Sequence, residues 1–293
     1  MMRLSARIFS GLFAASLFFP AGLAHAAPSL LAVPERPLQG QAVLVTVAGD
    51  PATPSPMVQS ATFDGKPLIF FVLNGSAEAL LGISLKKAPG EYLLKVIFDD
   101  ASHSVLERKI SVVGRTIEKA PLGIPESLGG NATSSQKKLV GSLASDNAIL
   151  ASIRTNKKVL WKEPFAAPLD SVLVTDPFGV MRQVGAYLIP HNGVDLRAAS
   201  GTPVKATNRG VVRIARALRT YGKTIVIDHG NGISSLYVHL SKISVSPGEV
   251  VGRQQEIGLS GGTGYSEGVH LHWGLRISGV PVDPMQFLAL FGR

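Results

Sequence analysis

Most of the chain alternates between short apolar, β-branched runs and turns rich in glycine and proline. In the first third, "QAVLVTVAG" has the composition of a strand, and "PGEYLLKVIFDDASHSVLERKISVV" reads as turn, strand, turn, strand. Within "ATFDGKPLIFFVL", Asp64-Gly65 is a hairpin signal between two apolar pieces. The pattern predicts a small N-terminal β-sandwich over 27–113, immunoglobulin-like in architecture, which we interpret as a binding, spacing or shielding module.

The pattern changes between 114 and 167, where we expect a linker followed by a helix. "APLGIPESLGGNATSS" is rich in Pro, Gly and Ser, as linkers are. Further on, apolar residues recur at roughly helical spacing: Leu139, Leu143, Ile149 and Ile153. Ser134 or Ser135 would cap the start of this helix. We expect the helix to pack between two domains.

Strand patterns return over 168–293. "GTPVKATNRGVVRIARAL", "KTIVIDHGNGISSLYVHL" and "VHLHWGLRI" are strand-like and separated by glycine turns, whereas helical periodicity is poor. The whole protein is therefore predicted to be mainly β, with a β-rich C-terminal domain.

The segment 1–26 has the pattern of an export signal. Arg3 and Arg7 precede an apolar run over 8–23, and Ala24-His25-Ala26 supplies a small-x-small cleavage site. An uncleaved anchor is the alternative, but a proline interrupts the run, which is shorter than the roughly 20 residues that span a bilayer. We predict cleavage after Ala26, no stable membrane span afterwards, and a periplasmic or secreted protein.

Charge and the lack of cysteine narrow the chemistry. The chain contains no cysteine, which excludes disulfides and thiolate metal sites, so a metal must be held by histidine and carboxylate. The formal net charge is +9, and losing the two arginines of the signal leaves +7. A basic exported protein is expected to associate with envelope polyanions, although the charge can also serve only solubility. No nucleic-acid motif is present, and no nucleic-acid partner is expected.

Five of the seven histidines lie in the C-terminal domain. His191 and Asp195 are four residues apart with Gly193 between them. Both side chains are zinc ligands in proteins, and we expect the glycine to let the backbone turn so that both reach one ion. Taken alone, the pair is better explained as a hydrogen-bonded pair in a surface loop.

The stretch "EGVHLHWGL" carries the strongest metal signal, because His270 and His272 flank one leucine. Alternate residues of a strand point to one face, so both rings can reach one spot, while Leu271 faces the core. A catalytic zinc commonly has three protein ligands and one open position. His191, Asp195 and one member of the pair complete such a set.

The other histidine of the pair and His239 would then stand beside the open position, where they can take a proton or stabilise an oxyanion. On a regular strand, His239 is expected to share a face with Tyr237. His229, which ends a strand-like run before "GNG", is interpreted as structural.

Residues from about 168 to 287 resemble the lysostaphin/LytM-type zinc metallopeptidases. The resemblance runs in order and spacing through "DPFGV", "HNGVDLRA", "GTPVKA", "YVHLSKI", "PGEVVGRQQEIGLSGGTG", "GVHLHWG" and "VDP". It implies a β-rich fold of the duplicated hybrid motif type with an open groove. It also implies His191, Asp195 and His272 as ligands of one Zn²⁺ per chain, with His239 and His270 as the catalytic histidines.

The chain departs from the family pattern at three places, namely Arg197, Lys223 and Trp273-Gly274. We expect these changes to affect packing or the groove wall, since none removes a predicted ligand or catalytic histidine. Some family members have lost metal ligands or catalytic histidines and only activate other enzymes.

The resemblance implies a zinc-dependent endopeptidase that hydrolyses peptide cross-links of bacterial peptidoglycan. The N-terminal module and the connector resemble, more loosely, those of exported Gram-negative relatives, which favours the D-Ala–diaminopimelate bond over a glycine bridge. The alternatives are a structural zinc site and a non-catalytic murein-binding regulator or activator of cell-wall amidases. Release of a blocked groove by an envelope regulatory protein is compatible with the sequence.

Overall fold

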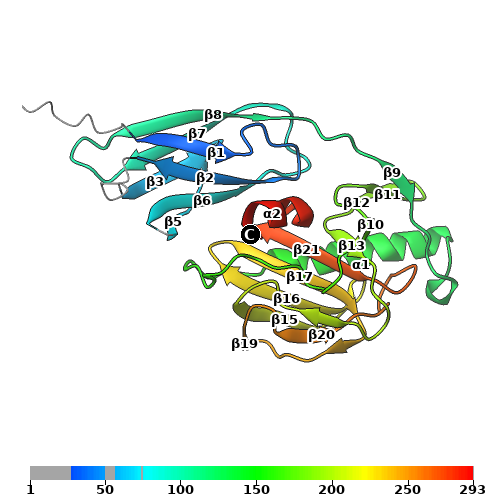
Figure 1. Ribbon diagram of the computed structural model, residues 1–293. Helices are drawn as coiled ribbons and strands as arrows, with labels where there is room; N and C mark the ends of the chain where they lie inside the picture. The colour runs from blue at the N-terminus through cyan, green and yellow to red at the C-terminus, as the bar shows by residue number, and fades with distance from the viewer. Residues whose placement is uncertain (1–27, 50–56, 74, 293) are drawn as a thin grey trace, which may run out of the picture.

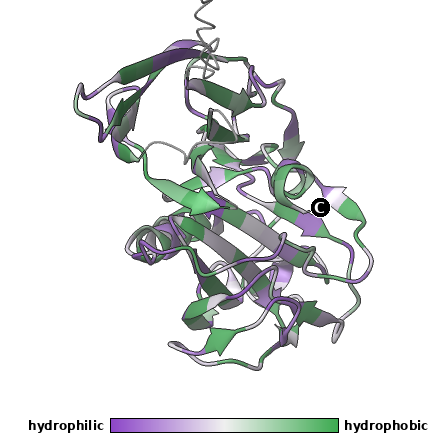
Figure 2. Ribbon diagram, turned by 60° about the vertical axis from the view of Figure 1, so that its left-hand side comes forward, coloured by the Kyte–Doolittle hydropathy of each residue, from purple (hydrophilic) through white to green (hydrophobic). Residues whose placement is uncertain are grey.

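The computed structural model describes residues 28–49, 57–73 and 75–292, so the predicted signal peptide and its cleavage site lie outside the described part. The protein is mainly β, as predicted (Figure 1). Apolar and polar residues alternate along many of the strands (Figure 2). Within the described ranges, none of the helices has the length and apolar character needed to cross a membrane.

Two four-stranded sheets form the N-terminal part, in the orders β1-β2-β6-β5 and β4-β3-β7-β8. Their inner faces enclose one apolar core, to which β2 contributes Val43, Val45 and Val47. The Asp64-Gly65 turn joins β3 to β4 with φ of 50° and 70°, which confirms the hairpin. The strands are β1 (Ser29–Val33), β2 (Ala42–Ala48), β3 (Val58–Phe63), β4 (Lys66–Pro67), β5 (Phe70–Leu73), β6 (Ser76–Gly82), β7 (Gly90–Phe98) and β8 (Val105–Val112).

The two sheets confirm the predicted strands, while the immunoglobulin-like topology and the domain limits 27–113, 114–167 and 168–293 stay predictions.

A larger sheet forms the C-terminal part, in the order β10-β13-β21-β17-β16-β15-β19, with β22 paired to β21. Its strands are β10 (Val174–Asp176), β13 (Val194–Leu196), β15 (Gly210–Leu218), β16 (Gly222–Gly230), β17 (Ile233–Leu240), β19 (Val250–Val251), β21 (Leu271–Ile277) and β22 (Val280–Val282). Two smaller sheets have the orders β12-β11-β9 and β14-β20-β18. Their strands are β9 (Lys119–Pro121), β11 (Met181–Val184), β12 (Tyr187–Pro190), β14 (Pro203–Lys205), β18 (Lys242–Ile243) and β20 (Glu256–Leu259).

The core face of β21 determines where its histidine points. Leu271 and Trp273 are completely buried in the main core, together with Tyr237 of the neighbouring strand. Because side chains alternate along a strand, His272 projects from the opposite face. Trp273 therefore shares the inward face with Leu271, as the sequence suggested for the leucine.

A β-bulge makes the predicted shared face of His239 and Tyr237 wrong. The register between β16 and β17 shifts so that Val238 and His239 oppose Thr224 alone, and His239 has φ of 61°. Such bulges redirect a side chain. The ring centroid of His239 lies 6.2 Å from that of His272, whereas the Tyr237 hydroxyl is hydrogen-bonded to Thr207 in the core.

The connector contains a 3-10 turn, η1 (Glu126–Leu128), and helix α1 (Thr133–Ala151). The predicted serine cap is wrong, because the N-cap position is Ala132 and no side chain caps this end. Ser135 lies inside the helix, and its hydroxyl donates to the Gly129 carbonyl 2.8 Å away.

The predicted place of this helix between two domains is also wrong. Leu150 of α1 packs against the large sheet, on Ile214, Val226 and Leu236. The helix between the sandwich and the sheet is instead α2 (Pro284–Phe291) (Figure 1). Its Gln286 side chain bonds both the N–H and the carbonyl of Ala42, at 2.9 and 3.0 Å.

Candidate metal centre and active site

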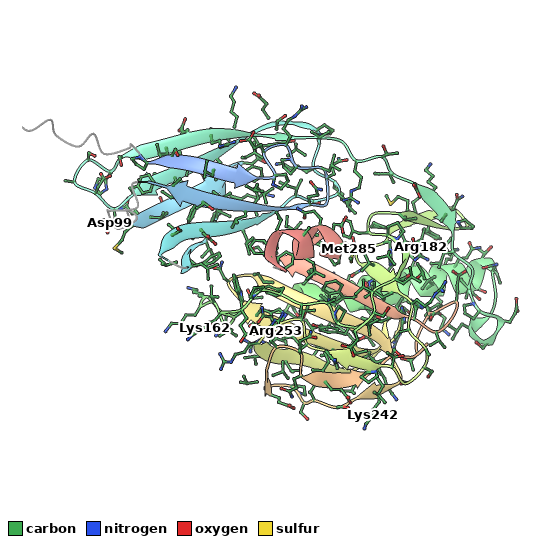
Figure 3. All side chains as sticks on the ribbon, viewed as in Figure 1. Asp99, Lys162, Arg182, Lys242, Arg253 and Met285 are labelled. Atoms are coloured by element: carbon green, nitrogen blue, oxygen red, sulfur yellow. The ribbon has the colours of Figure 1, made fainter. Side chains whose placement is uncertain are left out.

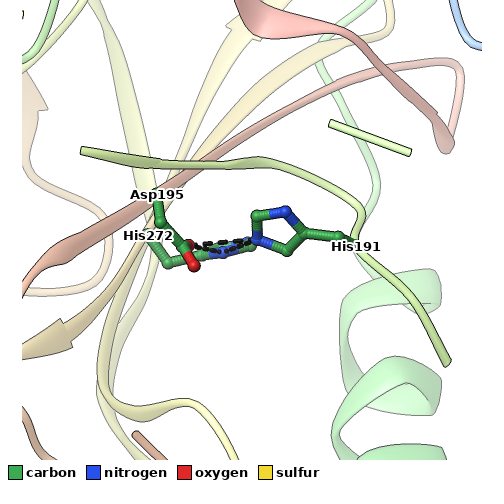
Figure 4. A group of neighbouring side chains, drawn as sticks. All are labelled: His191, Asp195 and His272. Atoms are coloured by element: carbon green, nitrogen blue, oxygen red, sulfur yellow. Dashed lines mark hydrogen bonds and ion pairs between the residues drawn. The ribbon is translucent and has the colours of Figure 1, made fainter. Parts of the chain in front are cut away.

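Strand pairing brings three of the predicted residues together. Asp195 and His272 are direct neighbours across the β13–β21 pair, and His191 stands just before β13. The His191 Nε2 atom lies 3.0 Å from Asp195 Oδ1 and 2.9 Å from His272 Nδ1, and the last two atoms are 2.8 Å apart. Figure 4 shows the three side chains converging on one point. Among the described residues, this group has the composition and spacing to hold a metal ion.

The chemistry of this group fits zinc. Two imidazoles and one carboxylate are common zinc ligands, and donors on a tetrahedral zinc lie about 3.3 Å apart for bonds of about 2.0 Å. His191 Nδ1 lies 2.8 Å from the Pro177 carbonyl oxygen. Donation of the Nδ1 proton to this carbonyl leaves the Nε2 lone pair directed at the group.

Gly193 serves the site differently from what the sequence suggested. Its backbone does not lie in the left-handed region, so no special turn requires glycine there. A Cβ at this position would instead lie 2.6 Å from both His272 Nε2 and the Trp273 carbonyl oxygen. The glycine is needed because the His272 ring occupies the space of a side chain.

His239 and His270 lie beside these three residues and share one arrangement, because the Nδ1 atom of each ring is hydrogen-bonded to a backbone carbonyl. The partners are the carbonyl oxygens of Thr263, at 2.8 Å, and Gly268, at 2.9 Å. This leaves both Nε2 atoms free to accept a proton. The two ring centroids are 5.0 Å apart, and His270 Nε2 lies 3.5 Å from Asp195 Oδ1.

Burial dominates the electrostatics of these groups. It lowers the pKa of His239 to about 3, aided by the neighbouring His270 and His272. Burial also lowers the pKa of His272, against the opposing effect of Asp195. For Asp195, burial raises the pKa, but hydrogen bonds from His191 and His272 outweigh it and lower the pKa overall. Neutral imidazoles beside a carboxylate are the protonation states that a metal ion needs.

Sequence reasoning missed Arg182 and Asp176. A guanidinium nitrogen of Arg182 lies 2.9 Å from Asp195 Oδ2, and the same nitrogen forms an ion pair with Asp176. Arg182 thus holds the carboxylate oxygen opposite the one that faces the histidines. Arg182 lies on β11 of the small sheet β12-β11-β9, well away from Arg253 in the view of Figure 3. Asp176 belongs to the quoted "DPFGV" block, but neither residue has a spacing that signals this contact.

His229 and Lys223 lie outside the cluster. His229 is fully buried between the Arg209 carbonyl, 2.9 Å from Nδ1, and the Ser235 hydroxyl, 2.7 Å from Nε2, which agrees with its structural interpretation. Lys223 bonds the carbonyl of Ser241.

A cleft of about 1070 Å³ opens over the five residues. Its lining joins three parts of the chain: residues 84–86 of the sandwich, the connector around β9 and α1, and the C-terminal domain. The connector also meets the loop that carries His270, because the Gly123 N–H donates to Glu267 over 2.8 Å. The five residues therefore line a cleft whose walls come from the sandwich, the connector and the C-terminal strands.

Comparison with known proteins locates the similarity on this site. Residues 189–284 match peptidase family M23. The chain is 47% identical over 106 residues to the peptidoglycan DD-endopeptidase ShyA of Vibrio cholerae, covering 36% of this chain and 25% of that protein. It is 40% identical over 119 residues to the DD-carboxypeptidase/endopeptidase Mpg of Neisseria meningitidis, covering 40% and 27%. The match therefore spans about a quarter of these curated relatives.

One solved structure is similar over nearly the whole chain. It is the crystal structure of a peptidase M23 protein from Pseudomonas aeruginosa, with 30% identity and a TM-score of 0.63. The similarity covers 87% of this chain and 96% of the other. On this evidence, the chain belongs to peptidase family M23.

Proposed function

We propose that this protein is a zinc-dependent endopeptidase that hydrolyses the D-Ala–diaminopimelate cross-links of bacterial peptidoglycan. One observation carries the proposal. Three metal-binding side chains converge on one point, and two further histidines beside them keep free Nε2 atoms at the cleft. A purely structural zinc site usually has four protein ligands, so three ligands in an open cleft favour catalysis.

Two of the relatives support the substrate, since their names describe peptidoglycan DD-endopeptidase and DD-carboxypeptidase/endopeptidase activities. The proposed export of the chain agrees with this substrate, because peptidoglycan lies outside the cytoplasm. The net charge of +7 without the signal would favour association with anionic murein.

His191, Asp195 and His272 would hold the zinc, with Arg182 fixing the carboxylate of Asp195. When bound, zinc supplies Lewis-acid chemistry, lowering the pKa of a water molecule toward about 7 and polarising the scissile carbonyl. The three side chains keep these donor atoms within 3.0 Å of one another, so little rearrangement is needed on binding.

His239 and His270 would handle the proton. Each donates its Nδ1 proton to a backbone carbonyl, so its Nε2 can accept the proton of the attacking water and return it to the leaving amine. The imidazolium formed in this way would also share the developing oxyanion charge. Their outer hydrogen bonds fix the tautomer and the ring orientation before substrate binds.

The test is mass spectrometry of purified murein sacculi after incubation with the zinc-loaded protein, with and without a chelator. We expect cross-linked dimers to become monomers, with a new diaminopimelate amine, only without chelator. Re-addition of zinc should restore cleavage. Sacculi that bind the protein but keep every cross-link would contradict the proposal and indicate a regulator of other murein enzymes.

A further inference from the structure

A buried carboxylate on helix α1 lies outside the group of proposed catalytic residues. Asp146 is only 2% exposed, and it belongs to the connector rather than to the residues that match the peptidase family. A buried carboxylate is costly unless several donors compensate it. The donors that it binds connect it to the active site.

The carboxylate accepts hydrogen bonds from three consecutive backbone N–H groups in the β15–β16 turn. These are the amides of Arg219, Thr220 and Tyr221, at 3.3, 2.6 and 3.4 Å. The next helix residue, Asn147, accepts a bond from the Tyr221 hydroxyl at 2.9 Å. Two neighbouring side chains of α1 therefore hold this turn through four hydrogen bonds.

The other side of the turn supports the histidine at the bulge. The Tyr221 carbonyl accepts the backbone N–H of His239 at 2.9 Å. His239 has φ of 61°, a conformation that a non-glycine residue keeps only when its surroundings impose it. The bond from Tyr221 is one such constraint, and Asp146 holds the residue that makes it.

The same turn also supports the loop that leads to His270. The Thr220 carbonyl accepts the N–H of Tyr265 at 2.9 Å. Gly264 approaches so closely that a Cβ on it would lie 2.4 Å from both the Thr220 carbonyl oxygen and the Gly222 nitrogen. Thr263, at the start of this loop, provides the carbonyl that binds the His239 ring.

We infer that Asp146 is a positioning residue for the proposed peptidase reaction, acting through the 219–222 turn on His239 and on the loop before His270. Helix α1 then helps to hold the catalytic histidines in position, in addition to connecting the two β-rich parts of the chain. The metal ligands lie on β13, β21 and the turn before β13, so this support does not pass through them.

The inference rests on the proposed function, and its test compares Asp146→Ala with Asp146→Asn and with a control on the same helix. The control is Leu150→Ala, which removes packing from the apolar cluster that Leu150 shares with the large sheet and with Tyr221, and leaves every hydrogen bond to the turn. On a purified cross-linked muropeptide, we expect Asp146→Ala to lower kcat by about 10- to 100-fold, since small displacements of a catalytic group cost that much. KM and bound zinc should stay near wild type.

Asp146→Asn keeps one strong acceptor and should recover part of kcat. Leu150→Ala should lower Tm at least as much as Asp146→Ala, with kcat within about twofold of wild type. Normal kcat in Asp146→Ala, or an equal loss of kcat in Leu150→Ala, would overturn the inference.

Hydrogen exchange separates this inference from the proposed function. Peptides covering 218–224 and 237–241 should exchange faster in Asp146→Ala than in Leu150→Ala, because only the first variant removes the hydrogen bonds to the backbone amides of the turn. If the wild-type protein cleaves no murein, the proposed function fails, and exchange alone decides the positioning role. Unchanged exchange in Asp146→Ala would then overturn it.

Discussion

At the scale of single residues, neighbouring histidines of the cluster differ in which ring nitrogen is held and which one is directed at the site. His272 offers its Nδ1 atom to the same point as Asp195 and His191, whereas His239 offers an Nε2 atom held by a bond to Thr263. We predict that His272→Ala loses both bound zinc and cleavage. His239→Ala should keep one zinc per chain and lose cleavage by about 10²- to 10⁴-fold, the usual contribution of a general base.

Zinc per chain, measured after dialysis, and kcat on a muropeptide dimer check this pair of variants. His229→Gln is a matched control, because it replaces a buried histidine remote from the cleft and should keep zinc. Normal cleavage by His239→Ala would contradict the role proposed for it.

Arg182 gives a second prediction at this scale. Its guanidinium binds Asp195 Oδ2 and leaves Oδ1 for the metal. Arg182→Gln should weaken zinc binding by about 10- to 100-fold, as loss of a residue behind a metal ligand commonly does. Arg182→Lys should lose less, because it keeps the charge without the planar fork. Competition with a chromogenic chelator measures the zinc dissociation constants of the wild type and of the two variants. Equal zinc affinity in all three proteins would contradict the proposed role of Arg182 in holding Asp195.

Strand alternation and the His-x-His pair pointed to one group formed by His191, Asp195, His239, His270 and His272. The division of this group into metal ligands and catalytic histidines came from the family resemblance and stays a prediction. The contacts that hold these residues in place could not be predicted from the sequence, because they depend on which strands pair. Arg182 and Asp195 come into contact only when the chain folds. Position 193 must be glycine because the His272 ring occupies the space that a side chain would fill. Asp146 is separated from the amides that it binds by more than 70 positions.

At the scale of elements, regular periodicity failed where the structure is irregular. The alternation rule placed His239 with Tyr237, and the bulge in β17 reverses this. The serine-rich start of α1 looked like a cap, yet the helix begins earlier, and Ser135 binds the Gly129 carbonyl instead. Neither the bulge in β17 nor the position where α1 begins has a signature in the composition or the hydrophobic pattern, so neither could be predicted from the sequence.

His229 on strand β16 should make the stability of the protein depend on pH. Complete burial lowers its pKa from 6.5 to about 4, although the Arg209 carbonyl and Asp228 oppose this shift. Between these two values, the unfolded chain binds a proton that the folded protein does not, so stability falls as the pH drops. The contribution of His229 to the free energy of unfolding should decrease by roughly 3 kcal/mol between pH 7 and pH 4.

Urea unfolding at several pH values tests this dependence. His229→Gln should be less stable at pH 7 and should show a shallower fall toward pH 4 than the wild type. His103→Asn, which changes an exposed histidine of the sandwich, is the control for the loss of one histidine elsewhere in the chain. An identical slope in His229→Gln and wild type would show that His229 takes up no proton on unfolding.

At the scale of the whole molecule, the sandwich and the large C-terminal sheet share one apolar core. Ala42 and Leu80 of the sandwich belong to the same buried cluster as Trp273 and Phe287. The sandwich also contributes residues 84–86 to the lining of the cleft. The sequence predicted both parts but not their junction, because α2 had no pattern that distinguished it from its surroundings.

Arg115 is the polar centre of this junction. One guanidinium nitrogen lies 3.0 Å from Asp283 Oδ2, and another donates to the Phe178 carbonyl at 3.1 Å. Asp283 also caps α2, and both side chains of the ion pair are more than four-fifths buried. Arg115→Ala leaves these acceptors without their donor, so we predict a loss of about 2 kcal/mol in the free energy of unfolding.

Calorimetry distinguishes a shared core from two independent units. Because the apolar cluster crosses the junction, the wild type should unfold in a single transition, and Arg115→Ala should lower the Tm of that transition for the whole molecule. Lys109→Ala is a suitable control, since it breaks an exposed ion pair with Glu91 inside the sandwich and should change Tm little. Two separate transitions in the wild type, with only one shifted by Arg115→Ala, would mean that the sandwich and the large C-terminal sheet fold without stabilising each other.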